Sequence, residues 1–175
     1  MQTLENKTIR LRALEPKDLD ILYSWENDMS IWYLSNTQIP FSKYTLKNYI
    51  KNSLLDIYTA KQLRLIIELK QDPRPLGAID LFDFDPFHLR AGVGILIGKT
   101  DDREKGYASE ALQTLIEYSF STFGLKQLYC SITEDNDQSL KLFIKYGFVI
   151  TGQKKAWIKK DNMWLTEFFL QLIHS

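Results

Sequence analysis

Residues 90–123, RAGVGILIGKTDDREKGYASEALQTLIEYSFSTF, pass from a strand pattern through a charged loop into a long helix pattern. The strand pattern covers 90–98, and the helix pattern begins at about Gly106. The first turn of a helix has unpaired backbone N–H groups and a partial positive charge, which together favour an anion. This order of strand, glycine-containing loop and helix therefore predicts an anion-binding loop.

The loop itself contains charges of both signs. Arg103 and Lys105 are donors suited to phosphate oxygens, whereas Asp101 and Asp102 would repel an anion. Gly106 allows the backbone to approach a ligand closely. These residues alone leave two interpretations open, a phosphate-binding loop and a solvated turn between a strand and a helix.

The rest of the chain also alternates between strand and helix patterns. We expect strands at 8–14, 63–69, 76–84, 90–98, 127–133, 148–158 and 164–172, and helices at 16–29, from Ser42 to 54, at 106–123 and at 138–146. The first two helices should bury Leu19, Leu22, Trp25 and Met29, and Leu46, Tyr49, Ile50 and Leu54.

The connections between these elements predict the sheet. Short turns containing proline at 72–75 and 85–88 favour antiparallel hairpins, whereas a helix between strands 90–98 and 127–133 favours a parallel pair. We expect an α/β fold of the mixed α+β kind, with a mostly antiparallel sheet flanked by helices, in a single domain over 1–175.

Composition excludes several classes of protein. Apolar residues make up 45% and charged residues 25%, as in globular chains. Lys plus Arg and Asp plus Glu each number 22, and zero net charge argues against broad nucleic-acid binding. The N-terminal MQTLENK is polar, and no apolar run approaches the roughly 20 residues that span a bilayer. We expect a cytoplasmic protein with no membrane partner.

Cysteine and histidine are too sparse to predict a metal site. Cys130 is the only cysteine, and it lies in an apolar strand pattern where a buried, inert thiol is expected. His88 and His174 are far apart in the sequence.

Three motifs in order resemble one family. REKGYA at 103–108, between a strand and a helix, resembles the (Gln/Arg)-x-x-Gly-x-(Gly/Ala) coenzyme A loop of the GNAT N-acetyltransferases. NDQS at 136–139 and YGF at 146–148 resemble that family's Asn-x-x-(Ala/Ser) and Gly-Phe segments. The order of elements is similar over essentially the whole chain. IRLRALEPKDLDILYSW at 9–25 is most similar to the branch with spermidine and ribosomal-protein N-terminal acetyltransferases.

The resemblance implies acetyl-CoA as cosubstrate, lying where strands 92–98 and 127–133 splay apart. The pyrophosphate would meet the backbone N–H groups of Arg103, Glu104, Lys105, Gly106, Tyr107 and Ala108. The pantetheine arm would pair with the backbone of Leu96 and Ile97, and would meet Asn136 and Ser139. Lys145 would reach an adenosine phosphate, unless it is only a solvated helix lysine.

The implied reaction is attack of a neutral amine on the thioester. Asp80 is the candidate base, since burial among apolar neighbours would make a carboxylate basic enough to act near neutrality; the alternative is an acid that points into water. Alternation places Asp80, Phe82 and Phe84 on one face of their strand. Many family members carry a tyrosine near the leaving sulfur where this chain has Phe143, so Ser139 is the remaining polar candidate.

The acceptor side is less defined by the sequence. Glu26 and Asp28 would supply an acidic rim, with Trp32, Tyr33 and Phe82 beside Asp80. The acceptor would be a polyamine-like or other small amine, an aminoglycoside or a protein N-terminus.

Two observations keep other interpretations open. Gly92 stands where polyamine-acetylating relatives carry a glutamate, which weakens the polyamine interpretation. The absence of the tyrosine at Phe143 favours a non-catalytic coenzyme A-binding regulatory module as the alternative function. An exposed strand edge near the C-terminus would permit a homo-oligomer.

Overall fold

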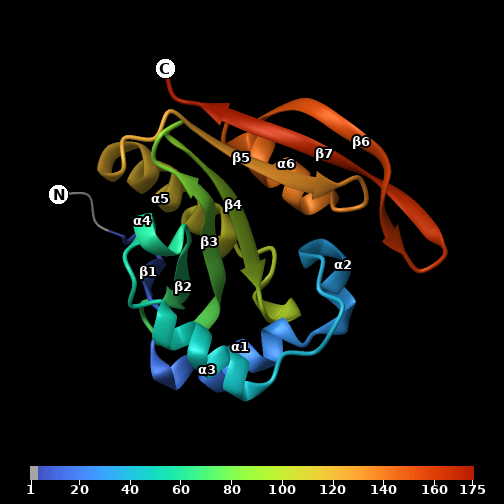
Figure 1. Cartoon of the computed structure of the whole chain (residues 1–175). Helices are drawn as coiled ribbons and strands as arrows, with labels where there is room; N and C mark the ends of the chain where they lie inside the picture. The colour runs from blue at the N-terminus through green and yellow to red at the C-terminus, as the bar shows by residue number, and fades with distance from the viewer. Residues whose placement is uncertain (1–3) are drawn as a thin grey trace.

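The computed structural model describes residues 4–175 and forms a seven-stranded sheet in the order β1-β2-β3-β4-β5-β7-β6 (Figure 1). Residues 1–3, part of the polar segment expected not to be a signal, lie outside the described residues. The strands are β1 Ile9–Ala13, β2 Leu63–Leu69, β3 Pro75–Asp85, β4 Arg90–Ile97, β5 Gln127–Thr133, β6 Val149–Lys160 and β7 Met163–Ile173. Among these named strands only β4 and β5 pair in parallel, which confirms the predicted mixed, mostly antiparallel fold.

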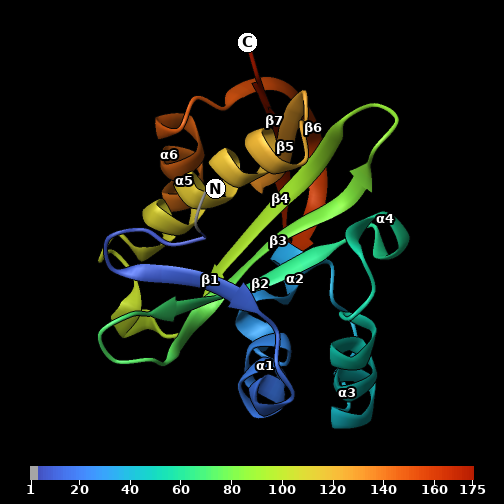
Figure 2. The same cartoon turned by 90° about the vertical axis from the view of Figure 1, so that its left-hand side faces the viewer.

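Helices cover both faces of the sheet. They are α1 Leu19–Glu26, α2 Trp32–Ser35, α3 Lys43–Asn52, α4 Ile57–Ala60, α5 Tyr107–Thr122 and α6 Asp137–Lys145, with short 3-10 turns at Pro16–Asp18, Met29–Ile31 and Thr100–Asp102. Figure 2 shows α5 and α6 on one side of the sheet and α1 and α3 on the other. In the described part of the chain, no helix is both long and apolar enough to cross a membrane.

Alternation along the central strands divides the buried residues into two cores. Leu65, Ile67 and Ile79 point to the α5 side, where they pack with buried residues of α5. Ile66 and Ala78 point to the opposite side and pack with α1 and α3. A strand buried on both faces has consecutive apolar residues, as β2 does at Leu65, Ile66 and Ile67.

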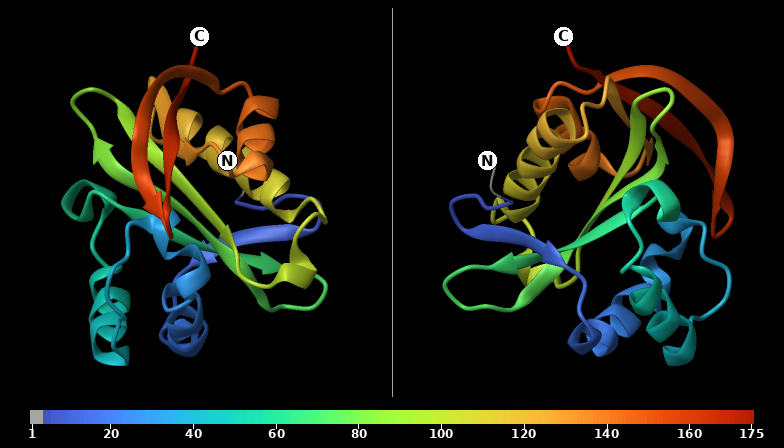
Figure 3. Two further views of the ribbon diagram at one scale, coloured as in Figure 1. Left: turned by 90° about the vertical axis from the view of Figure 1, so that its right-hand side faces the viewer. Right: turned by 60° about the vertical axis from the view of Figure 1, so that its left-hand side comes forward.

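The parallel pair separates soon after it begins. Its register contains only Arg90↔Gln127, Ala91↔Leu128 and Gly92↔Tyr129, although both strands continue beyond these residues. Beyond β5, the strands β7 and β6 form a long curved hairpin (Figure 3). The predicted splay of these two strands is therefore confirmed.

The first two helices are shorter than predicted. The first breaks after Glu26 and the chain continues through a 3-10 turn, so Met29 is 73% exposed rather than buried. Ser42 caps α3 as predicted by accepting from the Thr45 amide, but the helix ends before Leu54, which is 86% exposed. The sequence pattern also missed α2 and α4, each a single turn.

Phe84 lies on the face opposite to the predicted one. Asp83 has a φ of 48°, and the β3–β4 register shifts between Phe82 and Asp85. This bulge reverses the alternation, so Phe84 joins the core on the α5 side instead of the face of Asp80.

A buried ion-pair network ties β1 to β2 and to the start of α1. The Arg12 guanidinium donates to both carboxylate oxygens of Asp18 at 2.8 Å and to Glu68 at 2.6 Å. Asp18 and Glu68 are 2% and 3% exposed. Burial acts to raise the pKa of each carboxyl, but the hydrogen bonds from arginine outweigh it and hold both pKa values below their usual range.

We predict that Asp18→Asn lowers the free energy of unfolding by about 2 kcal/mol, because a buried guanidinium loses a charged partner. Urea denaturation at neutral pH measures this change. Asp20→Asn is the control, since the ion pair of Asp20 with Lys43 is exposed at both ends and its loss should leave the free energy of unfolding nearly unchanged.

The same pair of variants tests the pH dependence. A carboxyl whose pKa is lowered by folding stabilises the protein above its unfolded pKa of about 4, and this contribution is lost as pH falls. The gap between wild type and Asp18→Asn should therefore narrow as the pH falls below about 5. A gap independent of pH would contradict the role given to this carboxylate.

Candidate active site

The loop between β4 and α5 has the backbone geometry of an anion-binding turn. Gly106 is the N-cap of α5 with a φ of 84°, a conformation that favours glycine. A Cβ at this position would meet nothing within 4 Å, so the backbone angle and not crowding requires the glycine. Glu104 also has a positive φ of 61°. The loop thus presents the N-terminal N–H groups of a helix of 16 residues.

Asp102, at the start of this loop, is buried and paired with an arginine. It is 4% exposed and accepts two hydrogen bonds, at 2.7 and 2.8 Å, from Arg74 in the β2–β3 turn. The hydrogen bonds from Arg74 hold the pKa of Asp102 below its usual range. The prediction that Asp102 would repel an anion is therefore wrong, because Arg74 balances its charge. The sequence pattern gave no sign that Arg74 lies beside this loop.

Side chains from α6 lie against the same loop. Gln138 donates to Glu104 at 2.8 Å, and Lys145 donates to the Ser109 hydroxyl at 3.1 Å. That hydroxyl also lies 2.6 Å from the Tyr146 hydroxyl. Lys145 therefore reaches the first turn of α5, as expected of a residue near a bound phosphate, and Ser109 is a polar neighbour that the motif did not include.

A small cavity of about 150 Å³ opens where β4 and β5 part. Asn136 and Ser139 line it, as does Phe143, the position where many relatives carry tyrosine. The Asn136 side chain also caps α6 by accepting from the Ser139 amide at 3.3 Å. Of the backbone positions proposed for pantetheine, Ile97 accepts a hydrogen bond from Arg103 at 3.4 Å.

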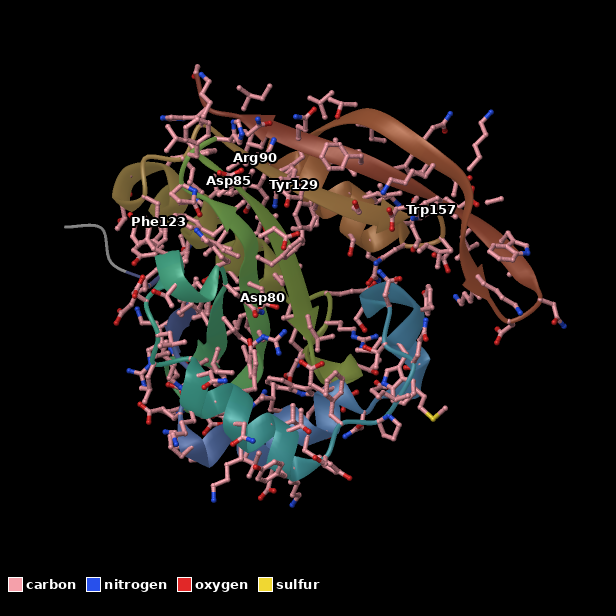
Figure 4. All side chains as sticks on the ribbon, viewed as in Figure 1. Asp80, Asp85, Arg90, Phe123, Tyr129 and Trp157 are labelled. Atoms are coloured by element: carbon pink, nitrogen blue, oxygen red, sulfur yellow. The ribbon has the colours of Figure 1, made fainter. Side chains whose placement is uncertain are left out.

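A larger cavity of about 620 Å³ lies beside it, on the α1 face of β3 and β4. The two cavities adjoin at the splay, because six residues line both: Leu34, Val93, Gly94, Ile95, Ser131 and Glu167. Figure 4 shows Asp80 and Tyr129 in the centre of the sheet and Trp157 across from them on β6. Two ligands can therefore meet at one point between the strands.

Asp80 lines this larger cavity, but its neighbours are not those expected. Arg64 on β2 donates to both oxygens of Asp80, at 2.8 and 2.7 Å, and also to Glu26 on α1. Burial acts to lower the pKa of Arg64, but the two carboxylates more than offset it and raise that pKa. The apolar environment predicted for Asp80 is therefore wrong, and Glu26, which also lines this cavity, shares Arg64 with Asp80 in a half-buried cluster.

The sequence missed Arg64, although register places it directly opposite Asp80. Its guanidinium lies 5.4 Å from the centre of the Tyr49 ring, and burial raises the pKa of Tyr49 to about 12. The contact of Arg64 with two carboxylates could not be predicted from the sequence, because it depends on the pairing of β2 with β3.

The other predicted acceptor residues divide into two groups. Trp32 and Phe82 line the larger cavity, and Trp32 donates its indole N–H to the Glu26 carbonyl at 2.9 Å. Tyr33 lines the small cavity and carries Lys160 over its ring at 4.3 Å. Asp28 caps the turn at Met29–Ile31 by accepting from Ser30, and it is not among the residues lining either cavity.

Glycines on β4 shape the floor of the larger cavity. Gly92 lies opposite Phe82, and a Cβ there would come within 2.3 Å of the Phe82 ring. Gly94 lies opposite Asp80, where a Cβ would meet the same ring only at an ordinary 3.8 Å. The aromatic ring thus occupies the space of a side chain at 92, and the absence of one at 94 leaves room beside Asp80.

Comparison with protein families decides the class of the protein. A family model described as an acetyltransferase (GNAT) domain matches residues 8–149. The chain belongs to the GNAT acetyltransferase family. It is accordingly an acyltransferase, an N-acetyltransferase that uses acetyl-CoA as cosubstrate, as the resemblance of its motifs implied. Among residues 4–175, no group of three or more His, Cys, Asp or Glu side chains could hold a metal ion.

Individual relatives agree with this GNAT assignment. The uncharacterized N-acetyltransferase p20 of Bacillus licheniformis is 25% identical over 99% of this chain and 97% of its own. Spermidine N(1)-acetyltransferase of Escherichia coli is 24% identical over 83% of this chain and 75% of its own. The predicted likeness to the spermidine acetyltransferase branch is confirmed.

Solved structures confirm the GNAT fold. Spermidine N-acetyltransferase from Vibrio cholerae, crystallised with CoA and spermine, superposes with a TM-score of 0.85 over 96% of both chains at 22% identity. A GNAT-family acetyltransferase from Bacillus anthracis has a TM-score of 0.79 over 97% of both chains at 20% identity. The sheet, its splay and its flanking helices are therefore those of a GNAT domain.

We predict that Arg103→Glu weakens acetyl-CoA binding at least about tenfold, because the loop would gain negative charge beside the phosphates. Isothermal titration calorimetry measures the dissociation constant. Lys47→Glu on α3 makes the same kind of charge reversal away from the loop and should leave the affinity unchanged. Equal affinities for wild type and Arg103→Glu would contradict the phosphate assignment.

Arg74→Gln should also weaken acetyl-CoA binding, because it removes both hydrogen bonds to the buried Asp102 carboxylate and leaves Lys105, at 3.9 Å, as its cationic partner. The double variant Arg74→Gln with Asp102→Asn removes both charges and should recover part of the loss. If the double variant binds no better than the single one, the effect comes from lost packing and not from charge.

Proposed function

We propose that the protein transfers the acetyl group of acetyl-CoA to a primary amine by direct attack within a ternary complex, and that residues 1–175 form one domain for this reaction. The observation that carries the proposal is the meeting of two cavities at the splay of β4 and β5. The smaller one adjoins the predicted coenzyme side, and the larger one contains the carboxylates suited to an amine. A small amine is the favoured acceptor, since relatives include spermidine acetyltransferases; a protein N-terminus is the other.

On the coenzyme side, the proposed contacts are those of the loop and of α6. The Arg103 N–H, predicted to meet the pyrophosphate, instead donates to the Thr100 carbonyl at 3.0 Å. The N–H groups of residues 104–108 would therefore bind the pyrophosphate, and Lys145 would bind an adenosine phosphate. Beyond Gly92 the register of β4 with β5 ends, which leaves the edge of β4 at Leu96 and Ile97 free of that strand to pair with pantetheine amides. Asn136 and Ser139 line the small cavity, which meets β4 just before this edge, at Val93, Gly94 and Ile95.

On the acceptor side, Asp80 is proposed as the base. An alkylammonium must lose a proton before its nitrogen can attack. Because Arg64 also contacts Glu26, the guanidinium stays paired with one carboxylate when Asp80 takes up that proton. Two carboxylates around one arginine thus leave one of them available for proton transfer.

Few polar groups of this chain could donate a proton or a hydrogen bond to the leaving thiolate. Phe143 is 3% exposed and packs edge-on against Phe148 at 5.0 Å, so its ring offers no proton. Ser139 is the proposed hydrogen-bond donor. A thiol with a pKa of about 8.5 is also an acceptable leaving group without a strong acid.

Self-association is a further part of the proposal. β6 lies at one end of the sheet, and most of its residues are exposed. Spermidine N-acetyltransferase from Vibrio cholerae has been described in a dodecameric structure. An exposed strand edge can pair with another copy of the chain.

Thioester consumption with a panel of primary amines, with mass spectrometry of the products, tests the reaction. An acetylated amine formed in step with free coenzyme A is the expected result. Tight binding of acetyl-CoA without turnover of any amine or peptide would instead identify a coenzyme A-binding regulatory module.

We predict that Asp80→Asn lowers kcat at least about 100-fold, as expected for loss of a general base. Glu26→Gln is the matched control, because it removes the other carboxylate from the same Arg64. It should raise KM and change kcat by less than about threefold. Steady-state kinetics at saturating acetyl-CoA separate the two, and equal effects on kcat would remove Asp80 as the base.

A further inference from the structure

We infer that the acceptor carries a single amine on an apolar, aromatic-sized body, and that the larger cavity selects against polyamines. This inference rests on the proposed function, whose acceptor it specifies. It follows from the charges and the side chains that line the cavity.

The charged residues that line the larger cavity leave one net negative charge. Its carboxylates are Glu26, Asp80 and Glu167, and its cations are Arg64 and Lys154. Arg64 pairs with Asp80 and Glu26 together, so that cluster keeps one uncompensated negative charge. Lys154 lies 3.4 Å from Glu167 and matches it. One ammonium group is therefore balanced, and a second or third would enter the cavity without a partner.

The remaining negative charge lies at one place, beside the splay. Asp80 is opposite Gly94, and Gly94 lines both cavities. The side chains of Asp80 and Glu26 are 17% and 22% exposed, so their attraction for an ammonium is only partly screened by water. The amine that binds there lies next to the edge where the thioester is proposed to lie.

Five aromatic side chains form part of the wall, which they share with Ser35, Asn36, Gln62 and Ser131. Trp25, Trp32, Phe82, Tyr129 and Trp157 all line the larger cavity. Phe82 meets Tyr129 edge-on at 6.0 Å, and it excludes any side chain at Gly92. An acceptor whose body is apolar buries this surface, whereas a polyamine would have to desolvate its other ammonium groups against it.

Two matched pairs of acceptors test the inference. Hexylamine and 1,6-diaminohexane have the same length and differ by one amine, and 2-phenylethylamine and spermidine differ in body and charge. We expect kcat/KM to be at least about tenfold higher for hexylamine than for the diamine, and higher for 2-phenylethylamine than for spermidine. Equal or faster acetylation of the diamine or of spermidine would overturn the inference and leave the proposed function intact. Turnover of no amine at all would overturn both.

A substitution of Lys154, which lines the larger cavity, separately tests the argument from the cavity's net charge. Lys154→Gln leaves Glu167 unmatched and should shift the ratio of kcat/KM towards 1,6-diaminohexane by at least about threefold. Lys155→Gln removes the neighbouring exposed charge, which is not among the residues that line the cavity, and should leave the ratio unchanged. The same ratio in wild type and Lys154→Gln would overturn the charge argument.

Discussion

The early end of pairing between β4 and β5 is the constraint on which the rest of this structure depends. Three residue pairs hold the two halves of the sheet together, and beyond Gly92 and Tyr129 the strands diverge. Parallel strands are joined by a helix, and here that helix, α5, begins at Gly106, directly after the loop proposed to bind the pyrophosphate. One topological choice therefore creates the gap, the loop beside it and the edge of β4 that faces a ligand.

Buried charge in this protein is consistently matched, and each match joins separate segments. Arg12 ties β1 to Asp18 and Glu68, Arg74 ties the β2–β3 turn to the coenzyme loop, and Arg64 ties β2 to β3 and α1. Unpaired, each of these charges would be costly to bury. Only the cluster at Arg64 has more carboxylates than cations and also lines a cavity. The excess carboxylate and its position on the cavity wall are why we propose a role in proton transfer for this cluster, and a stabilising role for the other two.

Much of the fold could be predicted from local patterns. Strands Leu63–Leu69 and Gln127–Thr133 have the predicted bounds, because a buried strand of seven residues is a strong apolar signal. Phe84 was misplaced because a single bulge residue, Asp83, reverses the alternation without any mark in the sequence. Met29 and Leu54 were misplaced because the apolar period continues past the point where the helix ends.

The loop proposed to bind the coenzyme could be predicted from the sequence because all its parts are consecutive. The acceptor side could not, because its decisive contacts are between residues distant in the chain. Asp80 was a candidate from the sequence, but Arg64 lies 16 residues away and meets it only through strand pairing. Asp102 looked like an obstacle to phosphate binding because Arg74, which neutralises it, is 28 residues away.

The contact between Phe82 and Gly92 has a consequence for how such a site can change. A side chain at 92 and a ring at 82 would occupy the same volume across two paired strands, so a side chain cannot be added at 92 while the Phe82 ring stays where it is. Acquiring a polar group at 92 requires a smaller residue at 82 first. A change of acceptor that needs a polar side chain at 92 would therefore require a first mutation that shortens residue 82 and leaves a void on β3. The protein could acquire the second mutation only if the sheet stays stable with that void.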